Sequence, residues 1–220
     1  MDFWYRFSKG MLGFYLTLFI KRIQVIGEEN LRPGPKIIAA NHPNLTDGFV
    51  LPFVIREKLH FVIQSDAFDV PILRFLLSKA DQIPLVRRRG QEALQNALAK
   101  LSAGKSVVIF PEGRLNHGAN LHRGRLGAAL LAHLSGAPIL PVGFFVLPEN
   151  TRMIAARIHD RISKACFQIR GACHVCIGKS WSVPQLTGVE LHPRSLRDLT
   201  TRIMSQIADL AGQASRAALG

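Results

Sequence analysis

The sequence predicts an α/β fold, in which a mostly parallel sheet carries helices on both faces and is preceded by an N-terminal helix. Short apolar runs alternate with segments of helical periodicity from residue 36 onward, which is typical of strand–helix units around a parallel sheet. The runs are continuously apolar, as expected for strands that are covered on both sides. With 220 residues, 48% of them hydrophobic, the chain has enough apolar side chains for one substantial core.

The elements of the predicted sheet follow one another in a regular order. Strands are expected at 36–40, 59–63, 82–86, 106–110 and 139–146, and helices at 47–56, 70–79, 91–101 and 125–134. Pro71 suits the first turn of the second helix, and Gly104 and Gly136 suit the ends of the third and fourth. The segment 165–177 predicts one or two further strands. Residues 193–217 predict a terminal amphipathic helix, with Leu196 and Leu210 on one apolar stripe.

The N-terminal segment predicts a helix that lies in a membrane interface. Its apolar run, residues 11–20, is shorter than the roughly 18 to 20 residues that cross a bilayer. It lacks the leading basic region and the small-residue cleavage site of a signal peptide. Aromatic residues with cations around them, among them Arg6, Lys9 and Lys21, favour an interfacial position for residues 1–22. A helix docked against the core is the alternative.

The charge predicts an anionic partner. Lys and Arg outnumber Asp and Glu by 28 to 15, giving a formal charge of +13, which suits nucleic acid, an acidic membrane surface or a phosphorylated substrate. Nucleic acid is the least favoured, because the arginines are not interleaved with aromatic residues. The three cysteines lie between residues 166 and 176 and predict small core side chains in a reducing compartment. They have no second ligand pair, so no metal site is expected.

Three polar clusters follow three of the predicted strands. His42 comes after strand 36–40, Arg87 after strand 82–86, and Glu112, Gly113 and Arg114 after strand 106–110. Parallel α/β sheets bind ligands in the crevice outside the carboxyl ends of their strands. The sequence therefore predicts that these clusters converge at one edge of the sheet.

The residue types in the clusters predict activation of a hydroxyl group. Histidine is a residue type whose ordinary pKa suits a general base, so His42 is the candidate base. Asp47 can orient its ring if His42 lies in the turn and Asp47 in the first helical turn. The simpler alternative is that Asp47 caps the helix and His42 is a loop residue. The chain has no Gly-x-Ser-x-Gly sequence, so direct attack by an acceptor hydroxyl is simpler than a covalent acyl-enzyme. Arg87 is a candidate to bind phosphate.

These residues resemble the conserved blocks of the glycerolipid acyltransferase family, typified by 1-acyl-glycerol-3-phosphate acyltransferase. The matching blocks are NHPNLTD at 41–47, IPLVR at 83–87, FPEG at 110–113 and PILPV at 138–142. Their order and spacing agree over residues 36–146, about half of the chain. The resemblance implies an acyltransferase domain at 23–220 after an N-terminal interfacial helix at 1–22.

The resemblance also implies a reaction and a set of partners. A fatty acyl group passes from acyl-CoA or acyl-carrier protein to the free hydroxyl of a lysolipid, with 1-acyl-glycerol-3-phosphate as the first choice of acceptor, in phospholipid synthesis. The implied enzyme is peripheral or monotopic on the cytoplasmic face of an anionic membrane. His42 and Asp47 are the implied catalytic pair. The implied substrate-binding residues are Arg87, Glu112, Gly113 and Arg114, with no metal or other cofactor.

The chain departs from the family pattern at acceptor-handling positions. Arg114 directly follows Gly113, where many members have an intervening Thr, and Gln64, Arg74 and Val86 replace a common Lys, Gly and Asp. A different lysophospholipid or other lipid is therefore the alternative acceptor to 1-acyl-glycerol-3-phosphate. A basic membrane-binding module without activity is the non-enzyme alternative.

Overall fold

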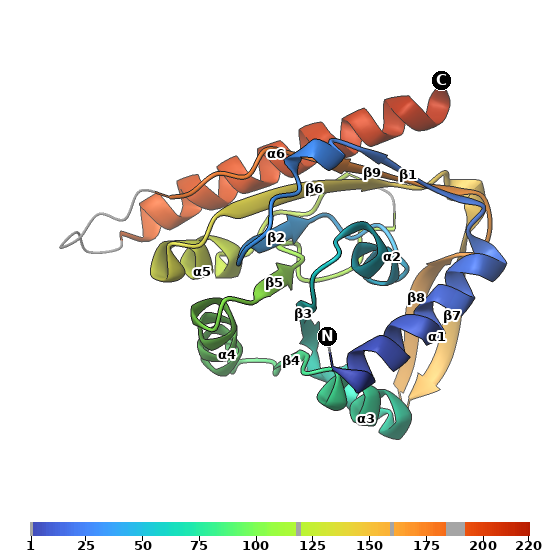
Figure 1. The fold of residues 1–220 in the computed structure, drawn as a ribbon, viewed down its shortest axis with the longest axis horizontal. Helices are drawn as coiled ribbons and strands as arrows, with labels where there is room; N and C mark the ends of the chain where they lie inside the picture. The colour runs from blue at the N-terminus through green and yellow to red at the C-terminus, as the bar shows by residue number, and fades with distance from the viewer. Residues whose placement is uncertain (1, 118–119, 159–160, 184–191) are drawn as a thin grey trace.

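The computed structural model describes residues 2–117, 120–158, 161–183 and 192–220. Seven strands form one sheet in the order β1-β9-β6-β2-β5-β3-β4, and β7 and β8 form a separate two-stranded sheet (Figure 1). The strands are β1 (Arg22–Ile26), β2 (Ile37–Ala40), β3 (Leu59–Gln64), β4 (Ile83–Leu85), β5 (Ser106–Ile109), β6 (Ile139–Phe145), β7 (Thr151–Ile158), β8 (Arg161–Gln168) and β9 (Ala172–Ile177). The α-helices are α1 (Phe3–Phe19), α2 (Asp47–Val54), α3 (Pro71–Lys79), α4 (Gly90–Ser102), α5 (Gly127–Ser135) and α6 (Pro193–Leu219).

The seven-stranded sheet is mostly parallel, which confirms the predicted fold class. β2 lies at its centre and pairs in parallel with both β5 and β6. β3 continues the parallel arrangement between β5 and β4. At the opposite side β9 runs antiparallel to β6, and β1 pairs in parallel with β9. The carboxyl ends of the central strands therefore share one edge, as a ligand crevice requires.

Helices cover both faces of the sheet, because the central strands are apolar on both sides. Ile38 and Ala40 of β2 belong to the core cluster that includes residues of α1 and α2. Their neighbours Ile37 and Ala39 belong to the cluster that includes residues of α4, α5 and α6. All four residues have no exposed surface. The alternation along one strand thus gives each face its own helical layer.

The structure contains three strands, β1, β7 and β8, that the sequence did not predict or predicted with other bounds. β1 is short and, among the described strands, pairs with β9 alone; its half-exposed positions lack the continuous apolar run that marks the central strands. β7 and β8 form an antiparallel ladder outside the main sheet, and the predicted strand segment 165–177 included only the last residues of β8. Polar and apolar residues are mixed along this hairpin, so periodicity alone does not identify it.

The N-terminal helix α1 combines the two interpretations that the sequence left open. Tyr5 and Leu16 are buried, and the Tyr5 hydroxyl accepts a hydrogen bond from the backbone N of Leu59 at 3.1 Å. The other face of α1 is apolar yet exposed; it carries Phe3, Phe7, Met11, Phe14 and Leu18. No helix in the described part of the chain is long and apolar enough to cross a membrane. The division of the chain at residue 22 stays a prediction.

Candidate active site

The turn that carries His42 is anchored to the neighbouring strand by Asn41. The Asn41 side chain donates to the carbonyl of Phe144 at 2.9 Å and accepts from the backbone N of Phe144 at 2.7 Å. Asn41 is 4% exposed, so both bonds are shielded from water. This two-point connection between the end of β2 and β6 fixes where the chain turns, and hence where His42 begins.

His42 and Asp47 face one another across this turn. His42 Nδ1 lies 3.2 Å from Asp47 Oδ2, and Asp47 is the first residue of α2. Asn44 supports the turn twice: its backbone N donates to Asp47 Oδ2 at 2.9 Å, and its side-chain oxygen accepts from the backbone N of Thr46 at 3.0 Å. The imidazole also stacks on Phe110, with ring centroids 3.9 Å apart. With Nδ1 directed at the carboxylate, Nε2 is the ring nitrogen left to exchange a proton.

Asp47 is buried inside the turn, and this affects its ionisation. Burial raises the pKa of Asp47 above its ordinary value, and the hydrogen bond with His42 opposes that rise. Its second oxygen, Oδ1, has no hydrogen-bond partner within the described ranges. A buried carboxylate of this kind holds the His42 ring in one orientation and stabilises the imidazolium that forms when His42 takes up a proton.

The carboxylate of Glu112 is occupied by protein donors. It accepts from the backbone N of His42 at 3.0 Å, from Asn116 Nδ2 at 2.9 and 3.0 Å, and from the backbone N of His122 at 2.8 Å. The side chain is 2% exposed. In this geometry Glu112 joins the His42 turn to the loop after β5. Its predicted contact with the substrate stays a prediction.

Gly113 and Arg114 continue this loop toward solvent. Gly113 has φ +67, and a Cβ atom there would lie 2.5 Å from Arg125 Nε, so any side chain would be strained and would displace Arg125. The Gly113 carbonyl accepts from Gln64 Nε2 at 3.3 Å. Arg114 is exposed, with Nη2 3.4 Å from His122 Nδ1. Of the two predicted anion-binding arginines, Arg114 is the one that directly follows the Glu112 loop.

Arg87 lies at the far side of the same sheet edge. It follows β4, which is separated from β2 by β5 and β3. At about 4.8 Å per strand, the ends of β2 and β4 are roughly 14 Å apart. Arg87 is exposed, and none of the hydrogen bonds or ion pairs found among the described residues involves its side chain. The structure thus brings His42, Asp47 and Glu112 together and leaves Arg87 outside this group.

Several residues that hold the turn were not predicted from the sequence. Gln168, at the end of β8, donates its backbone N to Thr46 Oγ1 at 3.0 Å, and its carbonyl accepts from the Tyr15 hydroxyl of α1. Leu45 donates its backbone N to the carbonyl of Cys166 at 2.8 Å. These partners lie more than 100 residues from the turn or on the N-terminal helix, so no local spacing reveals them. The β8 strand and α1 therefore support the turn that carries His42 and Asp47.

The cysteines lie in the interior of the fold. Cys166, Cys173 and Cys176 are all buried and free. Over the described ranges, no group of three or more His, Cys, Asp and Glu side chains is arranged to hold a metal ion.

The fold and the strand-end blocks together define a family. A family model described as Acyltransferase matches residues 22–145, more than half of the chain, and the chain belongs to this family. The resemblance seen in the four sequence blocks is thereby confirmed.

Particular relatives carry a more specific name. The chain is 30% identical to the 1-acyl-sn-glycerol-3-phosphate acyltransferase of Pseudomonas aeruginosa over 126 residues, which cover 55% of this chain and 48% of that protein. It is 27% identical to the Saccharomyces cerevisiae protein of the same name over 154 residues, 67% of this chain and 50% of that protein. It is also 27% identical to the chloroplastic LPAT1 of Arabidopsis thaliana, over 55% of this chain and 35% of that protein. The chain thus spans about half or less of the length of these curated relatives.

A solved structure shares the fold. The 1-acyl-sn-glycerophosphate acyltransferase PlsC from Thermotoga maritima superposes with a TM-score of 0.66 at 18% sequence identity. The match covers 94% of this chain and 77% of PlsC. The similarity of fold therefore extends well beyond residues 22–145.

Proposed function

We propose that this chain is an O-acyltransferase that moves a fatty acyl group from acyl-CoA or acyl-carrier protein to the free hydroxyl of a lysolipid. The observation that carries the proposal is the pair of His42 and Asp47, 3.2 Å apart at a strand end in a member of the acyltransferase family. The names of its relatives support 1-acyl-glycerol-3-phosphate as the acceptor, in phospholipid synthesis. The direct succession of Gly113 and Arg114 favours another lysophospholipid as the alternative.

The proposed mechanism needs one base and no covalent enzyme intermediate. His42 Nε2 removes the proton of the acceptor hydroxyl while its oxygen attacks the carbonyl carbon of the thioester. The new C–O bond forms, the C–S bond breaks, and the departing thiolate receives the proton from His42. Asp47 orients the ring and stabilises its cationic form. The reaction requires no metal and no prosthetic group.

We assign the acceptor head group to the polar loop beside this pair. The exposed Arg114 guanidinium suits a phosphate oxygen, and Arg87 suits a more distant part of an anionic head group. Glu112 and Gly113 act on the acceptor indirectly, because they set the path of the backbone between His42 and Arg114.

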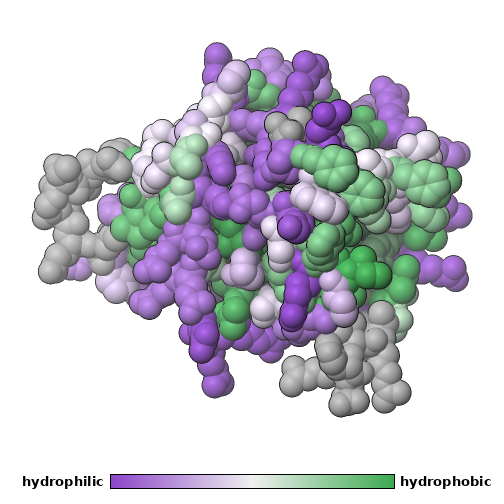
Figure 2. Space-filling model, turned by 60° about the horizontal axis from the view of Figure 1, so that its bottom comes forward, coloured by the Kyte–Doolittle hydropathy of each residue, from purple (hydrophilic) through white to green (hydrophobic). Residues whose placement is uncertain are grey.

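We place the enzyme at a membrane surface, peripherally or monotopically, on the cytoplasmic face. The exposed apolar side chains of α1 continue onto α3, where Ile72, Leu73 and Phe75 are 73%, 43% and 46% exposed. Trp4 of α1 packs edge-on against Phe75, with ring centroids 4.9 Å apart. Figure 2 shows apolar side chains gathered on the right of the molecule, the side on which α1 lies. An exposed apolar surface that extends over α1 and α3 and has basic flanks suits the interface of an anionic bilayer.

Vesicle flotation tests this placement. The double variant Phe7→Gln/Phe14→Gln alters only the exposed face of α1, whereas a truncation would also remove Tyr15 from the active-site turn. We expect it to float less with anionic vesicles, and the wild-type protein to bind less tightly at high salt or with neutral lipid. Leu134→Gln, an exposed apolar residue of α5, is the control. Equal flotation of all three proteins would contradict the interfacial role of α1.

A screen of acceptors tests the reaction itself. Lysolipids with different head groups are incubated with one long-chain acyl-CoA or one acyl-carrier protein, and products are identified by mass spectrometry. Production of a diacyl phospholipid supports the proposal, and the head group that is used identifies the acceptor. A protein that floats with vesicles but acylates none of the acceptors would instead be the basic membrane-binding module considered above.

A further inference from the structure

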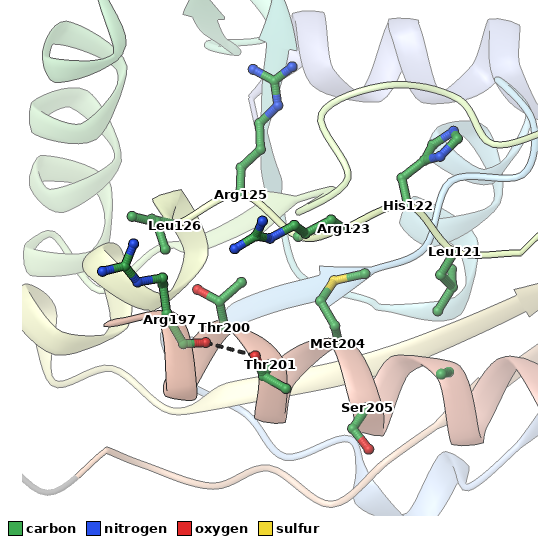
Figure 3. A pocket seen from close by; sticks show the side chains of 12 residues that line it. Leu121, His122, Arg123, Arg125, Leu126, Arg197, Thr200, Thr201, Met204 and Ser205 are labelled. Atoms are coloured by element: carbon green, nitrogen blue, oxygen red, sulfur yellow. Dashed lines mark hydrogen bonds between the residues drawn. The ribbon is translucent and has the colours of Figure 1, made fainter. Parts of the chain in front are cut away.

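A cavity separate from the His42–Asp47 pair lies between the loop that precedes α5 and one face of α6. Its volume is about 730 Å³. The loop contributes residues 121–126, and the helix contributes residues spaced three or four apart, so they lie on one face: Arg197, Thr200, Thr201, Met204, Ser205 and Ala208 (Figure 3). Small and hydroxyl-bearing side chains predominate on the helix side, which leaves room for a ligand along α6.

One end of this cavity is positively charged. Figure 3 shows the side chains of Arg123 and Arg197 extending to the same end, beside Thr200, whereas Arg125 points away from α6. Both Arg123 and Arg197 are exposed, and no hydrogen bond or ion pair of either guanidinium group was found with the described residues. None of the described residues that line the cavity is acidic. Two guanidinium groups without a partner among the described residues, at one end of a cavity, suit a phosphate group.

The other end of the cavity leads toward the active-site turn. A smaller pocket of about 80 Å³ is lined by Asn41 and Pro43, the neighbours of His42, and by Ala211 of α6. Leu121 lines both pockets, and Ala208 and Ala211 are neighbours on the same face of the helix. From Arg197 to Ala211 the helix advances by 14 residues, which is about 21 Å at 1.5 Å per residue. The two pockets thus follow one another along α6, from the arginines to the residues beside His42, and we refer to them together as the groove.

We propose that this groove binds the phosphopantetheine arm of the acyl donor, with its phosphate at Arg123 and Arg197 and its thioester near His42. The inference rests on the proposed acyl-transfer function. The arm is a narrow, extended chain of methylenes and amides with a phosphate at one end and the thioester at the other. Its chemistry matches a long groove that is basic at one end and small-residue-lined along its length. Acyl-CoA and acyl-carrier protein share this arm, so both donors fit.

Donor kinetics test the phosphate end of the groove. The variant Arg123→Gln/Arg197→Gln is compared with Arg194→Gln/Arg216→Gln, which removes the same charge from exposed positions of α6 that do not line the groove. We expect the first variant to raise the KM for acyl-CoA by about tenfold or more, as for lost charge-assisted hydrogen bonds. The KM for the lysolipid, and for an acyl-pantetheine that lacks the phosphate, should not change. An equal rise in the KM for acyl-carrier protein would show that both donors use the site. A rise in the KM for one donor alone would identify that donor as the one that uses it.

A second variant tests the path of the arm. Ala208→Phe places a large side chain where the two pockets meet, and Gln213→Phe places the same side chain at an exposed position of α6 outside the groove. We expect Ala208→Phe to lower kcat/KM with every donor, including acyl-pantetheine, while the melting temperatures of both variants stay close to that of the wild type.

Two results would overturn the inference while the proposed function stands: an unchanged donor KM in the double-arginine variant, or a raised KM for the lysolipid in place of the donor. Absence of turnover by the wild-type protein with any thioester would instead refute the proposed function. Calorimetric titration with CoA then tests the groove by itself, because binding to the wild type and about tenfold weaker binding to the double-arginine variant are still expected. No difference between the two proteins would overturn the inference.

Discussion

Replacement of Glu112 by Gln distinguishes a residue that builds the site from one that binds the acceptor. The Glu112 carboxylate accepts from the backbone N–H groups of His42 and His122 and from the Asn116 amide. Glutamine keeps the shape but replaces one acceptor oxygen with an NH₂ donor. One of the two partly buried backbone N–H groups, that of His42 or that of His122, then loses its acceptor and faces another donor.

The structure sets the size of the effect. A hydrogen bond to a charged group contributes about 1.5 to 3 kcal/mol, so we expect Glu112→Gln to destabilise the fold by about 2 kcal/mol. For a chain of this length that lowers Tm by about 4 to 8 °C. Turnover should fall as well, because the backbone of His42 loses an anchor, while the KM for the acceptor stays close to the wild-type value.

Thermal unfolding and steady-state kinetics measure both effects on one protein preparation. Glu92→Gln is the matched control. Glu92 is exposed in the first turn of α4, and its ion pair among the described residues is with the exposed Arg89 at 3.7 Å. Its replacement should therefore lower Tm far less than Glu112→Gln does and leave turnover unchanged. A Glu112→Gln protein with wild-type Tm and a raised acceptor KM would refute our reasoning. It would show that Glu112 contacts the acceptor, as the sequence analysis first predicted.

Two further predictions concern Asp47 and the arginines. Because the folded-state pKa of Asp47 is raised, the stability that its protonated form contributes is complete below the ordinary aspartate pKa and is lost as the pH rises through the raised value. The asparagine of Asp47→Asn cannot lose a proton, so the stability of this variant relative to the wild type should rise as the pH increases from acid to neutral, while its turnover falls. Thermal unfolding of both proteins at an acid and at neutral pH checks this. A fall in the relative stability of the variant over that range would contradict it. Arg114→Ala should weaken use of an anionic lysolipid by about 1.5 to 3 kcal/mol. Arg87→Ala should also raise the acceptor KM, by less because of its distance along the sheet edge; a raised donor KM instead would show that these roles are misassigned.

The fold class followed from sequence because each central strand is a continuous apolar run, as in β2 and β5. Burial on both faces leaves the same signature wherever such a strand occurs. β1 and the β7–β8 hairpin lack this signature. Among the described strands β1 pairs with β9, which lies far from it in the chain, and no local pattern of side chains identifies that partner. β7 and β8 pair with each other outside the main sheet, so they are not covered on both faces in the way the central strands are.

The candidate site was likewise predictable from the sequence only in part. His42 and Asp47 are five residues apart, so a turn can bring them together, and residue chemistry alone suggested the pair. The environment of Glu112 depends on a contact 70 residues away, with the backbone of His42. A carboxylate at a strand end can face a ligand or the protein, and the sequence does not show which. The groove along α6 likewise becomes visible only when residues 121–126 are packed against residues 197–208.

The central claim is that His42 acts as the base in acyl transfer, and the turnover of His42→Ala tests it most directly. The imidazole is held by Asp47 and Phe110, while the backbone of residue 42 keeps its bonds to Glu112 and Asn116, so the variant should fold. With the acceptor identified by the screen, we expect turnover to fall by about 10² to 10⁴, with the acceptor and donor KM values little changed. Near-wild-type turnover by a folded His42→Ala protein would contradict the account.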